Sequence, residues 1–344
     1  MDCGIKKTIF ALYIPGEMLD NGFAGGFFGT TKKERSNMGK LARVITWSSD
    51  EQYGKDRAGI LRQLSDQLEA SAHYNPDLLC FTEEVMLACG DENWREDNEL
   101  ALELFREGAR RLHTNVICCL EEPSEAYPGR SYNTIYFIDR EGTILKKYRK
   151  RHITFRAISR RGLSGEALAV CDMDIGRVGA MICFDLGWRD DWKALKDMGA
   201  ELIVWSSAYH GGFLPNAYAA VHQYWVVTSV WNRAISRIIN PFGEEVAHSS
   251  RWESFAMADI DLGAELFHFD HHNQVPTVLR RELGNKVDMT IKDGDNIFML
   301  SSRDAQWPLS RIKEHYGLHT YGEYQAQSTL DNIRMLEKYP PEEE

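Results

Sequence analysis

Several patterns that mark particular classes of protein are missing from this sequence. Its 7 cysteines include no Cys-x-x-Cys pair and no metal-ligand spacing, which is typical of reduced thiols rather than of a disulfide framework. The longest stretch without Asp, Glu, Lys or Arg, 202–232, contains adjacent glycines, a proline and histidines, so no transmembrane helix is expected. The apolar stretch near the N-terminus is short and lacks a signal-cleavage pattern. We therefore expect a cytoplasmic protein.

Positive charge is also in the minority. The chain has 40 Lys and Arg against 51 Asp and Glu, a formal net charge of −11. Such a surface repels phosphate backbones and anionic membranes, so we expect no nucleic-acid partner and no membrane partner. The stretch 146–161, KKYRKRHITFRAISRR, is locally basic. A run of this kind is usually a solvated hairpin and loop; the alternative is a cationic mouth of a binding site.

The order of apolar segments indicates an α/β fold. Strands are predicted at 41–47, 78–82 and 116–120, and apolar residues at helical spacing lie between them. This β-α-β-α-β pattern favours a largely parallel sheet. Hairpins around Gly142 and Pro241 and short buried strands at 178–182, 202–207 and 226–230 follow.

We divide the chain into three parts. Residues 1–39 form an N-terminal extension, rich in glycine and then in charge, and 40–262 form the main domain. Residues 263–344 form a C-terminal extension that packs on the core or on a partner subunit, with predicted helices at 307–317 and 321–338.

Three segments place reactive side chains at the ends of predicted strands. They are FTEE (81–84), KKYRKRHITF (146–155) and GAMICFDLGW (179–188). Together, over roughly 41–261, they resemble the carbon–nitrogen hydrolase (nitrilase) superfamily, and the ordered set is far more specific than a lone Glu, Lys or Cys. The resemblance implies an αββα sandwich without a cofactor, which pairs through its helices as a homodimer or larger even homo-oligomer.

The resemblance also implies roles for individual residues. Cys183 is the expected nucleophile, and Glu83 is the general base that takes its proton, since a protonated thiol is a weak nucleophile. Lys150 and the backbone N–H of Phe184 are expected to stabilise the oxyanion. The same carboxylate then activates water to hydrolyse the thioester. The expected substrate is a small-molecule amide or N-carbamoyl compound.

Each assignment has a plainer alternative. Buried cysteines are often inert, and Cys80, Cys118, Cys119 and Cys171 are interpreted in that way. Adjacent residues on an extended strand end point in opposite directions. The family register selects Glu83, so Glu84 is expected to face solvent or form a salt bridge. Trp188, Tyr209 and Phe213 are candidates for an apolar wall of the pocket, but each could equally be core.

Two departures from the family pattern leave the substrate open. Many relatives carry a second glutamate in the loop after the lysine, whereas this chain has only Glu166, too late in the sequence, and its loop carries Arg156, Arg160 and Arg161. Arginine recognises carboxylates in a bidentate manner, so Arg160 and Arg161 are candidate substrate-binding residues; pairing with surface carboxylates is the alternative. Gly187 stands where relatives that act on carbamoylated amino acids often carry Arg. Nitrile hydrolysis by the same triad remains a further alternative, although true nitrilases tend to show Trp-Glu after the cysteine.

A separate motif, HFDHHN at 268–273, suggests a different class of enzyme. It groups His268, Asp270, His271 and His272, so a metal-dependent hydrolase must be considered. Ligands so closely packed rarely enclose one ion without a partner from elsewhere in the chain. We therefore expect no metal and interpret the motif as a loop or subunit contact. A non-catalytic scaffold with the same fold is the remaining alternative.

Overall fold

The computed structural model describes residues 40–49, 56–90, 92–231, 235–270 and 272–341. The predicted N-terminal extension therefore lies outside the described residues. Two large sheets form the main domain. The first has the order β13-β1-β2-β3-β4-β5, with β6 paired to β4. Its strands are β1 (Leu41–Trp47), β2 (Leu78–Cys80), β3 (Asn115–Pro123), β4 (Ser131–Ile138), β5 (Ile144–Arg149), β6 (Gly162–Leu163) and β13 (Phe255–Asp261).

The second sheet has the order β12-β11-β10-β9-β8-β7. Its strands are β7 (Val170–Met173), β8 (Gly176–Ile182), β9 (Leu202–Ser207), β10 (Trp225–Val230), β11 (Arg237–Ile239) and β12 (Glu245–His248). Its central strands β8, β9 and β10 run parallel. In the first sheet β1, β2 and β3 run parallel, as the β-α-β-α-β pattern predicts.

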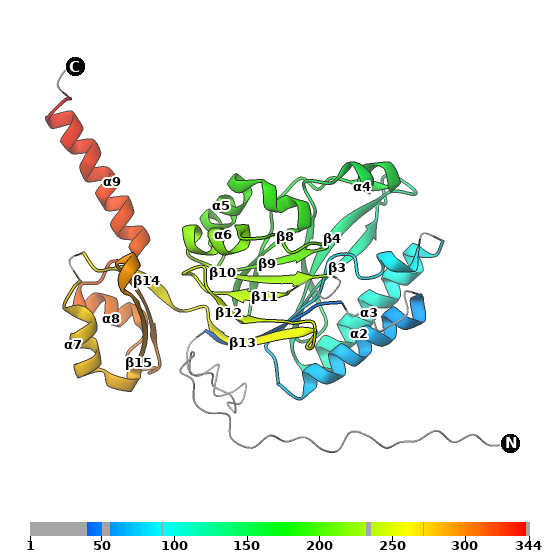
Figure 1. Cartoon of the computed structure of the whole chain (residues 1–344), viewed down its shortest axis with the longest axis horizontal. Coiled ribbons are helices and arrows are strands. Elements are labelled where there is room, and N and C mark those ends of the chain that lie inside the picture. The colour runs from blue at the N-terminus through cyan, green and yellow to red at the C-terminus, as the bar shows by residue number, and fades with distance from the viewer. Residues whose placement is uncertain (1–39, 50–55, 91, 232–234, 271, 342–344) are drawn as a thin grey trace.

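Helices cover the outer face of each sheet (Figure 1). On the first sheet these are α2 (Arg57–Ala72) and α3 (Trp94–Leu112), and on the second they are α5 (Arg189–Asp197) and α6 (Leu214–His222). The short elements η1 (Leu87–Cys89), α4 (Phe155–Arg160) and η2 (Cys183–Gly187) lie in the connections. The layer order is that of an αββα sandwich, so the expected fold class is confirmed.

The alternation of side chains along the first sheet explains why it is covered on both faces. On β1, Val44 belongs to the core between the two sheets, whereas Ile45 belongs to the core under α2 and α3. Cys80 and Leu79 on β2 divide in the same way. Successive strand residues point to opposite faces, so a continuously apolar strand needs a layer on each side.

The C-terminal segment forms a smaller unit with its own sheet and core. Its sheet has the order β14-β16-β15, and its core includes Phe267, Phe298 and Leu300. The elements are β14 (Glu265–His268), α7 (Val275–Glu282), η3 (Gly284–Lys286), β15 (Val287–Lys292), η4 (Asp293–Asp295), β16 (Ile297–Ser302), α8 (Leu309–Tyr316) and α9 (Tyr321–Lys338). Ion pairs of Arg303 with Asp261 and of Lys292 with Glu244 join this unit to the main domain.

Helix α9 extends away from the rest of the chain (Figure 1). None of its residues is buried, and Leu330, Ile333 and Leu336 are exposed along it. Among the described residues, no helix combines the length and the apolar character needed to cross a membrane.

Candidate active site

Cys183 lies at a sharp turn between β8 and η2. Its φ angle is +46°, in the left-handed region that non-glycine residues seldom adopt and that costs of order 1–3 kcal/mol. The carbonyl of Cys183 accepts a hydrogen bond of 3.1 Å from Trp205 Nε1. The surrounding structure therefore holds the thiol in a conformation that the strand alone would not adopt.

Asp185 fixes this turn from inside the protein. Its carboxylate accepts hydrogen bonds from the Ile182 N–H at 3.1 Å, the His152 N–H at 2.9 Å and the Tyr148 hydroxyl at 2.7 Å. Burial raises the pKa of Asp185, while these donors oppose the shift. Since Tyr148 and His152 flank Lys150 in sequence, one buried carboxylate positions the cysteine turn and the lysine segment relative to each other.

Glu83 and Lys150 form a buried pair. Lys150 Nζ lies 2.7 Å from Glu83 Oε1, and the two residues are 4% and 5% exposed. Glu83 Oε1 also accepts from Asn133 Nδ2 at 2.9 Å, and Oε2 accepts from the Ala208 N–H at 3.0 Å. These contacts hold the carboxylate in one orientation, as a buried charge requires.

A second cysteine supports this arrangement. The thiol of Cys119, on β3, donates to Asn133 Oδ1 at 3.0 Å. Burial raises the pKa of Cys119 well above its ordinary value, so this thiol keeps its proton. An amide whose oxygen accepts from a thiol must turn its NH₂ group the other way, here toward Glu83. The inert core role expected for Cys119 therefore includes fixing the orientation of Asn133.

The charges around Cys183 keep its thiol protonated at rest. Burial, followed by the charge of Glu83, raises the pKa of Cys183 to about 12, and Lys150 opposes the shift. Burial lowers the pKa of Lys150, but Glu83 and Cys183 raise it by more, so the lysine stays charged. A protonated thiol needs a base at the moment of attack, and Glu83 is the neighbouring carboxylate.

A cavity of about 250 Å³ opens on these groups. Glu83, Lys150 and Cys183 all line it, so the structure brings together the residues expected to form the triad. The other lining residues are Glu84, Leu87, Glu121, Ser131, Asn133, Ile153, Thr154, Arg156, Ala157, Arg160, Arg161, Gly162, Leu163, Ala208 and Trp231. Sequence reasoning missed Asn133, Glu121 and Trp231, because residues of these types on a strand or just after it carry no pattern that separates them from core.

The expectation for Glu84 is wrong. Glu84 lines the same cavity as Glu83 instead of facing solvent or forming a salt bridge. Its φ angle is +40°, so the chain leaves the extended conformation at this residue and the opposite-direction rule for strand neighbours no longer applies. The turn is held by a hydrogen bond from the Leu87 N–H to the Glu84 carbonyl at 2.8 Å.

The arginines after Lys150 reach the cavity, and they also form ion pairs. Arg161 is buried and donates to Glu121 Oε2 through Nη2 at 2.6 Å, and Arg160 Nη1 lies 3.8 Å from Glu121 Oε1. Arg156 is exposed at the edge of the same cavity. The arginines thus lie at the cavity, as expected of substrate-binding residues, and they also pair with a carboxylate of the protein, as the alternative expected. The ion pair with Glu121 holds Arg161 within the cavity wall.

The aromatic residues proposed as a pocket wall lie elsewhere. Trp188, Tyr209 and Phe213 do not line this cavity, and they are 38%, 44% and 76% exposed. The side chain of Phe184, which is 44% exposed, does not line it either. Trp188 stacks on the His152 ring at 3.8 Å. The backbone N–H of Phe184 follows the nucleophile directly in the chain, and its role in stabilising an oxyanion stays a prediction. The wall is built instead by the segment 153–163, which the sequence marked only by its charge.

The histidine motif makes structural contacts in the C-terminal unit. His268 stacks on Tyr324, Asp270 accepts from the Tyr324 hydroxyl at 2.7 Å, and His272 Nε2 accepts from the His319 N–H at 3.2 Å. His271 lies outside the described residues. Within the ranges that the structure describes, no His, Cys, Asp and Glu side chains gather in a group that could hold a metal.

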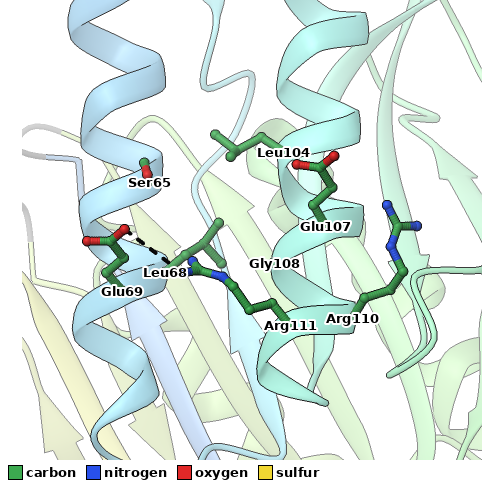
Figure 2. Close-up of a pocket in the computed structure, with 8 residues that line it drawn as sticks. All are labelled: Ser65, Leu68, Glu69, Leu104, Glu107, Gly108, Arg110 and Arg111. Carbon is green, nitrogen blue, oxygen red and sulfur yellow. Dashed lines mark ion pairs between the residues drawn. The ribbon is translucent and has the colours of Figure 1, made fainter.

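A second cavity, of about 590 Å³, lies between α2 and α3 (Figure 2). Gly108 permits this close helix packing, since a Cβ there would lie 2.8 Å from Leu68 Cδ1. Its charged residues include Arg111 and Glu69, which form an ion pair of 3.9 Å. It contains no thiol and no buried acid–base pair, so the cavity at Cys183 is the candidate reaction site.

The sequence matches a family model and several known proteins. The family model described as carbon-nitrogen hydrolase matches residues 45–265. The chain is 29% identical to omega-amidase NIT2 from Homo sapiens over 161 residues, which is 39% of this chain and 57% of that protein. It is also 29% identical to the probable hydrolase nit2 of Schizosaccharomyces pombe over 204 residues, covering 51% of this chain and 72% of the relative. The match to the human relative thus spans little more than half of that protein's length.

Solved structures show the same fold. An amidase from Nesterenkonia sp. superposes with a TM-score of 0.57 at 17% identity, covering 64% of this chain and 90% of that one. A carbon-nitrogen hydrolase from Helicobacter pylori G27 gives a TM-score of 0.59 at 17% identity, covering 72% and 94%. At these identities the likeness concerns the fold, and function must be argued from the site.

Proposed function

The chain belongs to the carbon–nitrogen hydrolase family of the nitrilase superfamily, and from this premise we propose that it hydrolyses the amide or N-carbamoyl bond of a small molecule. The observation that carries the proposal is the convergence of Cys183, Glu83 and Lys150 on one cavity, with Lys150 Nζ 2.7 Å from Glu83. We assign this activity to the domain 40–262, and 263–344 to an extension that packs against it.

In the first half of the reaction, Glu83 takes the proton of Cys183 as the sulfur attacks the carbonyl carbon. A C–S bond forms, and the carbonyl oxygen becomes an oxyanion that the Lys150 ammonium and the Phe184 N–H stabilise. The intermediate collapses with cleavage of the C–N bond. Protonated Glu83 gives its proton to the departing nitrogen, which leaves as ammonia or an amine.

The second half of the reaction releases the acid. Glu83, now a carboxylate again, takes a proton from water as the water oxygen attacks the thioester carbon. The C–S bond breaks and the Cys183 sulfur recovers a proton from Glu83. Because the pKa of the Cys183 thiol is raised to about 12, the released sulfur favours its protonated form, which drives the proton return from Glu83.

The preferred substrate, in our proposal, carries a carboxylate as well as the scissile amide. Arg156 and Arg160 line the cavity beyond Lys150, and Arg161 is paired with Glu121 in its wall. Guanidinium groups at this end favour an anionic group through charge-assisted hydrogen bonds. The human relative is named an omega-amidase, which supports this class of substrate.

We further propose that the protein assembles as a homodimer or larger even oligomer, and that α9 contributes to the contact. The exposed side chains of Leu330, Ile333 and Leu336 recur every three residues on a helix with no buried residue. This spacing places them along one side of the helix, and an apolar stripe of this kind is stabilised when another apolar surface covers it.

Turnover of small amides tests the proposed activity. Cys183→Ala and Cys183→Ser should fold normally, judged by circular dichroism, and lose nearly all turnover, because no other thiol lines the cavity in the described part of the chain. Cys89→Ala is the matched control, since Cys89 is also only partly buried but lies outside the cavity. Clear activity in Cys183→Ala would rule out the mechanism.

A further inference from the structure

Two acidic residues of the cavity, Glu84 and Glu121, take no part in the proposed reaction, and Glu121 is ion-paired with Arg161. Glu84 is partly buried and lines the cavity together with Glu83, Lys150 and Arg160. Its left-handed φ angle of +40° turns the chain. The turn is fixed on one side by the hydrogen bond from the Val85 N–H to the Cys119 carbonyl at 3.3 Å. A non-glycine residue persists in this conformation only where its surroundings enforce it, which is common at binding sites.

The groups that face Glu84 come from four elements. Glu83 follows β2, Glu121 and the Cys119 thiol lie on β3, Lys150 follows β5, and Arg160 ends α4. Burial, then the charges of Glu83 and Glu121, raises the pKa of Glu84 to about 8, and Lys150 and Arg160 oppose the shift. Near neutral pH the side chain is therefore a neutral carboxylic acid with an O–H donor.

Within the described part of the chain, this donor meets no protein acceptor. The Glu84 carboxyl group forms no hydrogen bond or ion pair with any residue in 40–49, 56–90, 92–231, 235–270 or 272–341. Glu84 lines the same cavity as the Glu83–Lys150 pair and Arg160, and the charges of all three act on it.

We propose that Glu84 is a specificity-determining residue whose carboxyl O–H donates a hydrogen bond to a carboxylate oxygen of the substrate, on the side of the cavity where Arg160 lies. The inference rests on the proposed function, because it requires an amide substrate that also carries a carboxylate. Protonated Glu84 adds a donor without adding negative charge. Ionised Glu84 loses the donor and repels the substrate carboxylate, so the residue favours anionic amides only while it is neutral.

The proposal gives a defined pH dependence of binding. Burial raises the pKa of Glu84 in the free protein to about 8, so binding is fully present well below that pH and is lost as the pH rises through it. From about pH 7 to about pH 9 the protonated fraction falls from roughly nine-tenths to one-tenth. The dissociation constant of an anionic amide should therefore rise roughly tenfold, because affinity scales with the competent fraction.

The experiment measures binding without turnover. Cys183→Ala protein is titrated by calorimetry with a short dicarboxylic acid monoamide, and with the matching diamide, at about pH 7 and about pH 9. The monoamide should bind roughly tenfold more weakly at the higher pH, and the diamide should change less than about twofold. Glu84→Gln in the same background keeps a neutral donor, so it should bind the monoamide about equally at both pH values.

Glu125→Gln is the matched control, because Glu125 is exposed and does not line the cavity; it should keep the tenfold change. Three results would overturn the proposal: a monoamide affinity that is constant with pH in the parent, an unchanged pH dependence in Glu84→Gln, or no monoamide binding at all. Wild-type turnover tests the proposed function separately. If the wild type hydrolyses amides but binding shows no pH effect that depends on Glu84, only the role of Glu84 is removed. If binding shows that pH effect but no amide is hydrolysed, only the catalytic assignment is removed.

Discussion

Replacing Asn133 with alanine should lower the enzymatic activity by far more than any loss of folding stability would explain. Asn133 Nδ2 donates to Glu83 Oε1 at 2.9 Å, and both residues are buried. The change removes one of the donors that orient the carboxylate and leaves the contacts with Lys150 and the Ala208 N–H. It also deprives the Cys119 thiol of its acceptor.

The size of the effect follows from the charge on Glu83. A hydrogen bond to a charged group contributes about 1.5–3 kcal/mol. This hydrogen bond should stabilise the transition states in which Glu83 takes or gives a proton. Its loss should then lower kcat/KM roughly 10- to 150-fold, since about 1.4 kcal/mol corresponds to tenfold. The loss should appear mainly in kcat, because Asn133 orients the base.

The assay compares initial rates of amide hydrolysis with unfolding in denaturant. Asn216→Ala is the matched control: Asn216 is similarly buried and bonds to Arg237 at 2.8 Å and to the Gly243 carbonyl at 3.0 Å, away from the cavity. It should lose stability while keeping kcat/KM within about threefold of wild type, a change worth less than 1 kcal/mol. If Asn133→Ala keeps full activity, or Asn216→Ala loses as much, the account of how Glu83 is oriented is wrong.

Three other outcomes are expected. Tyr148→Phe removes the 2.7 Å bond to buried Asp185 and should lower the free energy of unfolding by about 1–3 kcal/mol; an unchanged denaturation midpoint would contradict the role given to Asp185. Arg160→Ala should reduce kcat/KM for an acidic amide by a factor that corresponds to about 1.5–3 kcal/mol, and should leave kcat/KM for the neutral ester of that amide unchanged. Equal losses for both substrates would place Arg160 outside substrate recognition. Replacing Leu330, Ile333 and Leu336 together with serine should lower the mass measured by light scattering; an unaltered assembly, or a monomeric wild type, would remove α9 from the interface.

The parts of the fold that follow from sequence are those with a clear period. The apolar strands 41–47, 202–207 and 226–230 and the helix 321–338 were predicted with nearly the bounds that the structure has. Such segments are specified locally, because a continuous apolar run or a helical repeat fixes both the element and its burial. The family resemblance supplied the αββα layering, which periodicity alone leaves open.

The site was less accessible to sequence reasoning for two physical reasons. Glu84 was misplaced because the rule for strand neighbours fails once the chain enters a left-handed turn, and no glycine marks that turn. The aromatics Trp188, Tyr209 and Phe213 are candidates for an apolar wall from the sequence, yet the segment 153–163 lines the cavity and they do not. Which of two neighbouring segments closes over a cavity depends on tertiary packing, and residue type alone does not determine it.

The distinction between Glu83 and Glu84 shows what the structure adds. Both are glutamates at the end of β2, but only Glu83 has the contacts with Lys150, Asn133 and the Ala208 N–H. Glu84 lacks such donors, and burial beside Glu83 raises its pKa to about 8. Two adjacent carboxyl groups thus lie in different electrostatic surroundings, a separation that suits different tasks in one site.

The most direct test of the central claim weighs Cys183 during the reaction. Wild-type protein is quenched in acid while it turns over an amide, Cys183→Ala protein is treated in the same way, and both are digested and mapped by mass spectrometry. The mechanism predicts an adduct of the amide mass less its amine on the peptide that contains Cys183, and none in Cys183→Ala. Hydrolysis without any such adduct, or an acyl group on a different cysteine, would contradict it.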